Sequence, residues 1–89
     1  MESCKVYIPV TADFRDDGSI LPRELIWEDG TTYTIDRVID VRPAAAAKAG
    51  GQGDRYTIEV NGHRTYLFFE RGTKPSGNNL GRWFLERKQ

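Results

Sequence analysis

Hydrophobic and polar residues alternate along most of the chain, most regularly on either side of Asn61-Gly62. An Asn-Gly pair readily adopts the two positive φ angles of a type I′ turn, whose twist matches that of the strands it joins. The turn places on one face of the hairpin the residues Tyr56, Ile58, Val60, Leu67 and Phe69. The opposite face receives Arg55, Thr57, Arg64, Tyr66 and Phe68. The pattern predicts a β-hairpin over residues 55–70, with its apolar face turned inward.

The beginning of the chain predicts another half-buried strand. Its even positions are apolar, namely Val6, Ile8, Val10, Ala12 and Phe14. Pro9 falls on the polar side, and a proline has no backbone N–H to donate to a neighbouring strand. We therefore expect this strand to lie at a sheet edge or to be interrupted by a bulge.

A second hairpin is predicted around Asp29-Gly30, between two apolar runs. If these two residues form the whole loop, Ile26 lies opposite Tyr33, and both share a face with Ile35. Arg37 then interrupts the apolar side of the long return strand. A bulge close to Arg37, or a strand bent across two sides of a barrel, would account for the interruption.

The segment that begins at Pro43 has a different character. Proline suits the first turn of a helix, the alanines that follow have high helix propensity, and Gly50 suits the position after a helix end. We expect a short helix near residues 44–49, docked on the sheet because a helix of this length is unstable alone. Residues 72–81 are expected to form a loop before a last strand at residues 82–86.

These elements predict an all-β fold in which residues 1–89 form one domain with six strands, two tight hairpins and one short helix. The expected arrangement is a small six-stranded antiparallel barrel or roll, of which the SH3-like barrel is a familiar form. A five-stranded oligonucleotide-binding barrel is the alternative. No amphipathic segment is long enough to cover a flat sheet as a helix.

Composition limits the cellular location and the kinds of partner that we expect, but it does not indicate a function. Lys and Arg number 13, as do Asp and Glu, so no net charge draws the chain toward nucleic acid or an anionic membrane. The first 41 residues nevertheless carry a net charge of −5 and the others +5, which would give either one basic face or locally paired charges. Cys4 is the only cysteine, and no run approaches the ~20 apolar residues of a membrane span. We expect a soluble, cytoplasmic protein without a membrane partner.

Candidate catalytic and metal-binding residues are few. His63 is the only histidine, and it follows the hairpin turn, where solvent rather than a protected pocket is expected. One cysteine and one histidine cannot fill a tetrahedral zinc site. Asp36 and Asp40 would lie roughly 13 Å apart on an extended strand, beyond the ~5 to 9.5 Å that glycoside hydrolysis requires. The glycine-rich residues 50–53 lack the Lys-Ser/Thr of a phosphate-binding loop. We expect no enzyme activity, no catalytic residue, no metal and no cofactor.

One face of the predicted sheet has the composition of a binding surface. Two aromatic rings lie among two arginines on the polar side of the Asn61-Gly62 hairpin, and the last strand adds one more of each. The candidate set is Arg55, Arg64, Tyr66, Phe68, Arg82 and Phe84. Rings flanked by guanidinium groups are used to stack on unpaired bases near phosphates. The expected partner is a macromolecule, either single-stranded nucleic acid or, if the rings bury against protein, a protein partner or a second copy of the chain. The other reading is that the helix or the second wall of the barrel covers the rings.

Several motifs resemble a group of short uncharacterised bacterial β-rich proteins. They are Trp27-Glu28-Asp29-Gly30, Tyr33-Thr34-Ile35-Asp36-Arg37-Val38, Tyr56-Thr57 and the closing Arg82-Trp83-Phe84-Leu85-Glu86. Members of the group have a Trp-turn-Tyr hairpin and a Trp-aromatic-aliphatic-Glu closing strand, so the resemblance covers most of the chain, although the loop at residues 72–81 is longer here. Some such proteins appear beside DNA-repair polymerases, and the resemblance therefore implies at most a weak preference for a function that involves nucleic acid. It supplies no catalytic residues.

Overall fold

Strands dominate the structure, a computed structural model that describes residues 3–45, 52–72 and 80–88. The described strands are β1 (Ser3–Tyr7), β2 (Val10–Phe14), β3 (Ile20–Ile26), β4 (Thr32–Thr34), β5 (Arg37–Ala45), β6 (Gln52–Val60), β7 (His63–Arg71) and β8 (Gly81–Lys88). The described part of the chain contains no helix. The all-β class predicted from the sequence is confirmed.

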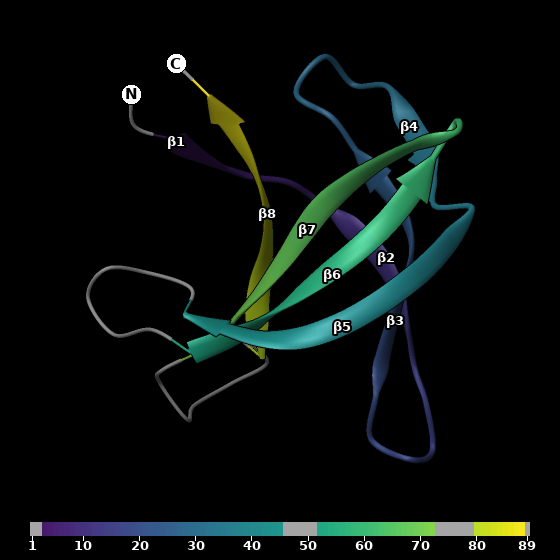
Figure 1. Ribbon diagram of the computed structural model, residues 1–89, viewed down its shortest axis with the longest axis vertical. Coiled ribbons are helices and arrows are strands. Elements are labelled where there is room, and N and C mark those ends of the chain that lie inside the picture. Colours follow the sequence, from purple (N-terminus) through teal and green to yellow (C-terminus); the bar gives the residue numbers. More distant parts are fainter. Residues whose placement is uncertain (1–2, 46–51, 73–79, 89) are drawn as a thin grey trace.

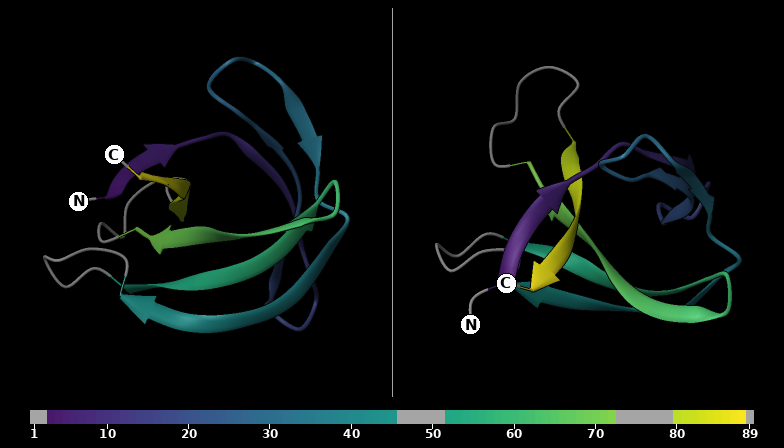
Figure 2. Two further views of the ribbon diagram at one scale, coloured as in Figure 1. Left: turned by 45° about the horizontal axis from the view of Figure 1, so that its top comes forward. Right: turned by 90° about the horizontal axis from the view of Figure 1, so that it is seen from above.

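The strands form two antiparallel sheets (Figures 1 and 2). The larger sheet has the order β1-β8-β7-β6-β5, and the smaller has the order β2-β3-β4. β5, β6 and β7 run side by side as a curved layer, and the smaller sheet lies toward one face of it (Figure 2). We call this face of the larger sheet the inner face and the opposite one the outer face.

A corner at Ile8-Pro9 connects the two sheets between β1 and β2. The Ile8 N–H donates to the Trp83 carbonyl oxygen of β8 (3.1 Å), whereas the Pro9 carbonyl oxygen accepts from the Ile26 N–H of β3 (3.1 Å). The chain thus leaves one sheet and enters the other within two residues. Because proline has no N–H, it breaks the ladder at this point. The predicted edge position is confirmed, because β1 and β2 each lie at a sheet edge, and the chain is interrupted at Pro9 by the corner rather than by a bulge.

A second corner, at Ile35-Asp36, separates β4 from β5. The Ile35 N–H donates to the Arg23 carbonyl oxygen of β3 (2.9 Å), and the Asp36 N–H donates to the Glu59 carbonyl oxygen of β6 (2.8 Å). The long return strand is therefore bent across both sheets. The prediction of six strands is wrong, because each of the two corners divides a segment that the sequence pattern had presented as one strand.

The predicted barrel is not found in the described residues, whose ladders form two open sheets. Within the described ranges, no ladder joins an edge strand of the larger sheet, β1 or β5, to an edge strand of the smaller sheet, β2 or β4. The SH3-like arrangement stays a prediction.

The short helix predicted near residues 44–49 is wrong at its start. Ala44 and Ala45 belong to β5 and lie opposite Gly53 and Gln52 of β6, and residues 46–49 lie outside the described part of the chain. The helix preference of alanine is worth less than about 1 kcal/mol per residue, and the backbone pairing offered by β6 outweighs it. The interior of the predicted loop, residues 73–79, also lies outside the described part of the chain.

The hairpin at Asn61-Gly62 has the predicted register. Asn61 and Gly62 have φ angles of 52° and 80°, as a type I′ turn requires. Val60 pairs with His63, and the pairing continues without a shift to Gly53 and Glu70. The two faces predicted for β6 and β7 are therefore the observed ones.

The turn at Asp29-Gly30 contains three residues rather than two. The Trp27 N–H donates to the Thr31 carbonyl oxygen (2.9 Å), and the Gly30 N–H donates to the Trp27 carbonyl oxygen (2.9 Å). Gly30 has a φ of 86°, and the Asp29 carboxylate accepts from the Thr31 N–H (2.9 Å). A type I turn followed by a left-handed glycine is the usual three-residue hairpin loop.

The additional loop residue shifts the predicted register by one position. Leu25 lies opposite Tyr33, and Ile26 lies opposite Thr32, so the expected pairing of Ile26 with Tyr33 is wrong. Leu25 is buried, whereas Ile26 is 38% exposed. The inward side of β3 is the opposite of the one that the sequence predicted.

The turn between β2 and β3 has the same design. Gly18 has a φ of 90°, its N–H donates to the Arg15 carbonyl oxygen (3.0 Å), and the Arg15 N–H donates to the Ser19 carbonyl oxygen (2.8 Å). The Asp17 carboxylate accepts from both the N–H (2.9 Å) and the hydroxyl (2.6 Å) of Ser19. Both hairpins of the smaller sheet therefore end in an acidic residue followed by Asp-Gly and a hydroxyl residue.

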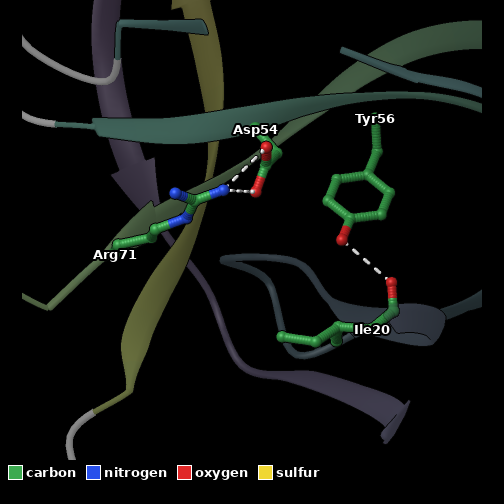
Figure 3. Close-up of polar contacts among 4 residues, drawn as sticks. All are labelled: Ile20, Asp54, Tyr56 and Arg71. Carbon is green, nitrogen blue, oxygen red and sulfur yellow. Dashed lines mark hydrogen bonds and ion pairs between the residues drawn. The ribbon is translucent and has the colours of Figure 1, made fainter. Parts of the chain in front are cut away.

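The core lies between the inner face and the smaller sheet. Its buried residues are Val6, Ile8, Leu25, Ile35, Tyr56, Ile58, Leu67 and Phe69. The Tyr56 hydroxyl also donates to the Ile20 carbonyl oxygen (2.9 Å), which joins β6 to β3 (Figure 3). Burial, followed by the negative charge of Asp54, raises the pKa of Tyr56.

Candidate binding surface

All six candidate residues lie on the outer face. The register pairs Phe68 with both Arg55 and Phe84, Glu70 with Arg82, and Glu59 with Arg64. Since side chains alternate along a strand, Tyr66 shares this face with Phe68. The hairpin register and the position of β8 beside β7 bring the predicted set together.

Phe84 forms the centre of an aromatic cluster on the outer face. Its ring is stacked on Phe68, with centroids 4.9 Å apart and planes 5° apart, and contacts Tyr7 edge-on at 5.5 Å. The Lys5 ammonium lies 4.7 Å from the Phe84 centroid. Because these neighbours leave Phe84 only 1% exposed, it supports the surface rather than offering its own ring to a partner.

Tyr66 is the predicted aromatic residue that solvent reaches best. It is 49% exposed, and the Arg55 guanidinium carbon lies 4.5 Å from its ring centroid. Arg64, two residues earlier on β7, is also exposed. An exposed ring, a guanidinium group against it and a second arginine nearby form the accessible part of the candidate surface.

Arg82 is held by two residues that the sequence did not identify, Tyr7 and Glu70. Its guanidinium carbon lies 4.0 Å from the Tyr7 centroid, and its Nη2 lies 3.7 Å from Glu70 Oε1. Glu70 also accepts from the Tyr7 hydroxyl (2.7 Å) and lies 3.8 Å from Lys5 Nζ. The hydrogen bond to Glu70 is the main reason that the pKa of Tyr7 is raised.

The sequence signal for Lys5 and Tyr7 was incomplete. Their odd positions on the first strand place them on the polar side, but nothing local shows that this strand pairs with β8. The pairing of Tyr7 with Phe84 is what adds them to the surface.

The edge of the outer face on β5 has a polar cluster of its own. Asp40 Oδ2 lies 3.1 Å from Arg42 Nε, and Arg42 lies opposite Arg55 of β6. The pKa of Asp40 is lowered, first by the Thr57 hydroxyl and then by Arg42 and Arg55. Asp40 is therefore a carboxylate at neutral pH.

Positive charge exceeds negative charge only slightly on the outer face. Among the side chains that the structure describes there, the cations are Lys5, Arg37, Arg42, Arg55, Arg64 and Arg82. The carboxylates are Asp40, Glu59, Glu70 and Glu86. Several of them pair locally, as Arg37 Nε does with Glu59 Oε1 at 2.8 Å. The face is mixed in charge rather than strongly basic.

Two clefts open between the sheets at opposite ends of the β6–β7 hairpin. The first, of about 380 Å³, is lined by Trp27, Tyr33 and His63 among others, and the single acidic residue among its described lining residues is Glu86, whose side chain belongs to the outer face. An apolar wall with one acid and one imidazole lacks the close pair of carboxylates that a hydrolase of the kind considered above would need.

The second cleft, of about 620 Å³, lies over Tyr56 and contains a single carboxylate, Asp54. Arg71 Nη2 donates to both Asp54 oxygens, at 3.2 and 3.0 Å (Figure 3). That carboxylate is therefore held in an ion pair. Within the described ranges, no group of three His, Cys, Asp or Glu side chains is placed to hold a metal ion.

Comparisons with models of known protein families, with curated proteins and with solved structures find no match to this chain. The part of the chain that the structure describes has no helix long and apolar enough to cross a membrane.

Proposed function

We propose that this protein is a non-enzymatic binding module that holds single-stranded nucleic acid on the outer face of its larger sheet. The observation that carries the proposal is the Tyr66 ring, half exposed on a strand and contacted by Arg55 at 4.5 Å. A ring in this position is a stacking platform for a base, worth about 1–3 kcal/mol per base. Arg55 and the exposed Arg64 supply the positive charge that phosphates require.

The remaining candidate residues have supporting roles in this proposal. Phe68 and Phe84 stack on each other and fill the centre of the face. Arg82 is engaged by Glu70 and by the Tyr7 ring. We therefore assign direct contact to Tyr66, Arg55 and Arg64, with Phe68 beside them. A cytoplasmic location and kinship with the short bacterial β-rich proteins are part of the same proposal.

The modest charge of the outer face sets the expected affinity. Because carboxylates lie among the cations, we expect dissociation constants in the micromolar range or weaker. Each phosphate that an arginine neutralises contributes about −0.7 to the slope of log K against log salt for a single strand. Binding should therefore fall steeply between low and physiological salt.

Fluorescence anisotropy with labelled single-stranded oligonucleotides at two salt concentrations tests the proposal. Tyr66→Ala should weaken binding by about 5- to 150-fold, the equivalent of one lost stacking contact. Phe14→Ala is the matched control, because the Phe14 ring is 65% exposed but lies on β2, away from the outer face. No binding at low salt, or equal effects of the two substitutions, would contradict the proposal.

A protein partner or a second copy of the chain is the second candidate. The mixed charge of the outer face favours it, because carboxylates such as Glu59 and Glu70 repel phosphates but can pair with the cations of a protein. Light scattering over a range of concentrations separates the candidates. A mass that rises toward that of a dimer, and that returns to the monomer value in Tyr66→Arg, would favour self-association through this face.

A further inference from the structure

The outer face places two arginines directly opposite each other on neighbouring strands. Arg42 of β5 is the register partner of Arg55 of β6, so their Cα atoms lie roughly 5 Å apart. Like charges in this relation destabilise a sheet. A negative charge between or above the two guanidinium groups would reduce this repulsion.

A bulge in β5 creates this pairing. The register shifts between Val38 and Asp40. Without the shift, Arg42 would lie opposite Asp54 rather than Arg55, and the cross-strand pair would have opposite charges. The β5 bulge therefore replaces an attractive pair with a repulsive one, and such irregularities are over-represented at functional sites.

Asp40 compensates only part of the positive charge. Its carboxylate engages Arg42 through Nε at 3.1 Å, and the Arg42 side chain remains 68% exposed. The Nε of Arg55 is buried without a hydrogen-bond partner among the described residues, and its guanidinium lies against Tyr66 instead. One carboxylate beside two guanidinium groups leaves one positive charge facing solvent.

We propose that Arg42 and Arg55 form a phosphate subsite on the outer face. This inference rests on the proposed function, because the phosphate would belong to a bound single strand whose adjacent base stacks on Tyr66. Guanidinium groups donate paired N–H bonds to phosphate oxygens, and one phosphate contacting both arginines would neutralise the charge that Asp40 leaves. Arg42 extends the surface toward β5, beyond the six residues that the sequence predicted.

Arg37 provides a matched control on the same strand and face. Its side chain is 63% exposed, and its Nε lies 2.8 Å from Glu59 Oε1. Its register partner is that same glutamate rather than an arginine. Arg37→Gln therefore removes one positive charge from β5 without altering the proposed subsite.

Inorganic phosphate tests the subsite without nucleic acid. Thermal unfolding of the full chain is compared in sodium phosphate and in sodium chloride at equal ionic strength. Phosphate at a concentration equal to its Kd should raise the Tm of the wild type and of Arg37→Gln by about 2–3 °C. The rise should disappear in Arg42→Gln. A phosphate effect equal in both variants would overturn the subsite.

Oligonucleotide titration ties the subsite to the proposed function. Arg42→Gln should weaken binding by about 3- to 10-fold and should reduce the salt slope by about 0.7, whereas Arg37→Gln should change neither by as much. If Tyr66→Ala weakens binding but the two arginine variants behave alike, the subsite fails and the proposed function stands. If phosphate stabilises through Arg42 but only a phosphopeptide binds, and no oligonucleotide does, the nucleic-acid assignment is overturned for both proposals.

Discussion

Tyr56→Phe removes a buried hydrogen bond between the two sheets and leaves the ring in place. The Tyr56 side chain is 5% exposed, its hydroxyl donates to the Ile20 carbonyl oxygen at 2.9 Å, and its ring packs 5.2 Å from that of Trp83. A phenylalanine keeps the ring contact. The change in stability should therefore report the hydroxyl alone.

The expected loss follows from the environment of the acceptor. A net intramolecular hydrogen bond is worth about 1 kcal/mol, and a carbonyl left without its partner adds to the cost if water cannot reach it. Ile20 is half buried, so water replaces part of the lost bond. We expect the free energy of unfolding to fall by about 1–1.5 kcal/mol, which lowers the Tm of a chain of this length by about 4–10 °C.

Urea unfolding followed by tryptophan fluorescence measures this loss, with Tyr33→Phe as the control. Tyr33 is a half-buried tyrosine on β4, and no hydrogen bond of its hydroxyl occurs within the described residues. Equal midpoints for the two variants, at equal m-values, would refute the reasoning. The raised pKa of Tyr56 adds a second check. A raised tyrosine pKa contributes stability below about pH 10 that is lost as pH rises through the folded value, so the gap between wild type and Tyr56→Phe should narrow above about pH 10.

Two further predictions concern a glycine and the two acidic turns. Gly81→Ala should cost about 1–3 kcal/mol, because a Cβ there would overlap the Glu70 carbonyl oxygen and lie 2.6 Å from Cζ of Phe69; an unchanged urea midpoint would contradict this. The carboxylates of Asp17 and Asp29 have lowered pKa values, because each accepts hydrogen bonds from the hydroxyl residue two positions later. A lowered pKa gives stability that is present above about pH 4 and lost as the pH falls through the folded value. In thermal melts, the Tm should therefore fall less between about pH 5 and pH 2 for the variant in which both Asp17 and Asp29 are replaced by Asn than for the wild type. Equal slopes of Tm against pH would count against the assignment.

Local signals in the sequence were sufficient where a turn sets the pairing by itself. Asn61-Gly62 admits a two-residue loop, and its register placed Tyr66 and Phe68 on the outer face. Asp29-Gly30 was ambiguous, because Asp-Gly also suits a three-residue loop in which the aspartate accepts a backbone bond. The one-residue difference reversed the faces of β3.

Features that depend on distant pairing could not be predicted from local pattern. The interruption of the alternating pattern at Arg37 left a bulge and a bend as alternatives, and it did not show that a register shift between Val38 and Asp40 would align Arg42 with Arg55. The inclusion of Tyr7 and Glu70 depends on the first strand meeting the last. The alanines after Pro43 have a local signal for helix, but at Ala44 and Ala45 pairing with the neighbouring strand β6 outweighs this weak preference.

The pairing of Ser3 with Lys88 and of Tyr7 with Phe84 has a consequence for how the molecule assembles. The ladder partner of β1 is β8, seven strands later in the chain, so a contact between the first and the last described strands must form before the larger sheet is complete. Contacts of such wide sequence separation slow folding, because the entropy of closing the long loop is lost before the contact repays it. During synthesis, β1 can pair with β8 only after β8 has left the ribosome. The two strands of the β2–β3 hairpin, and those of the β6–β7 hairpin, are neighbours in the sequence and can pair earlier.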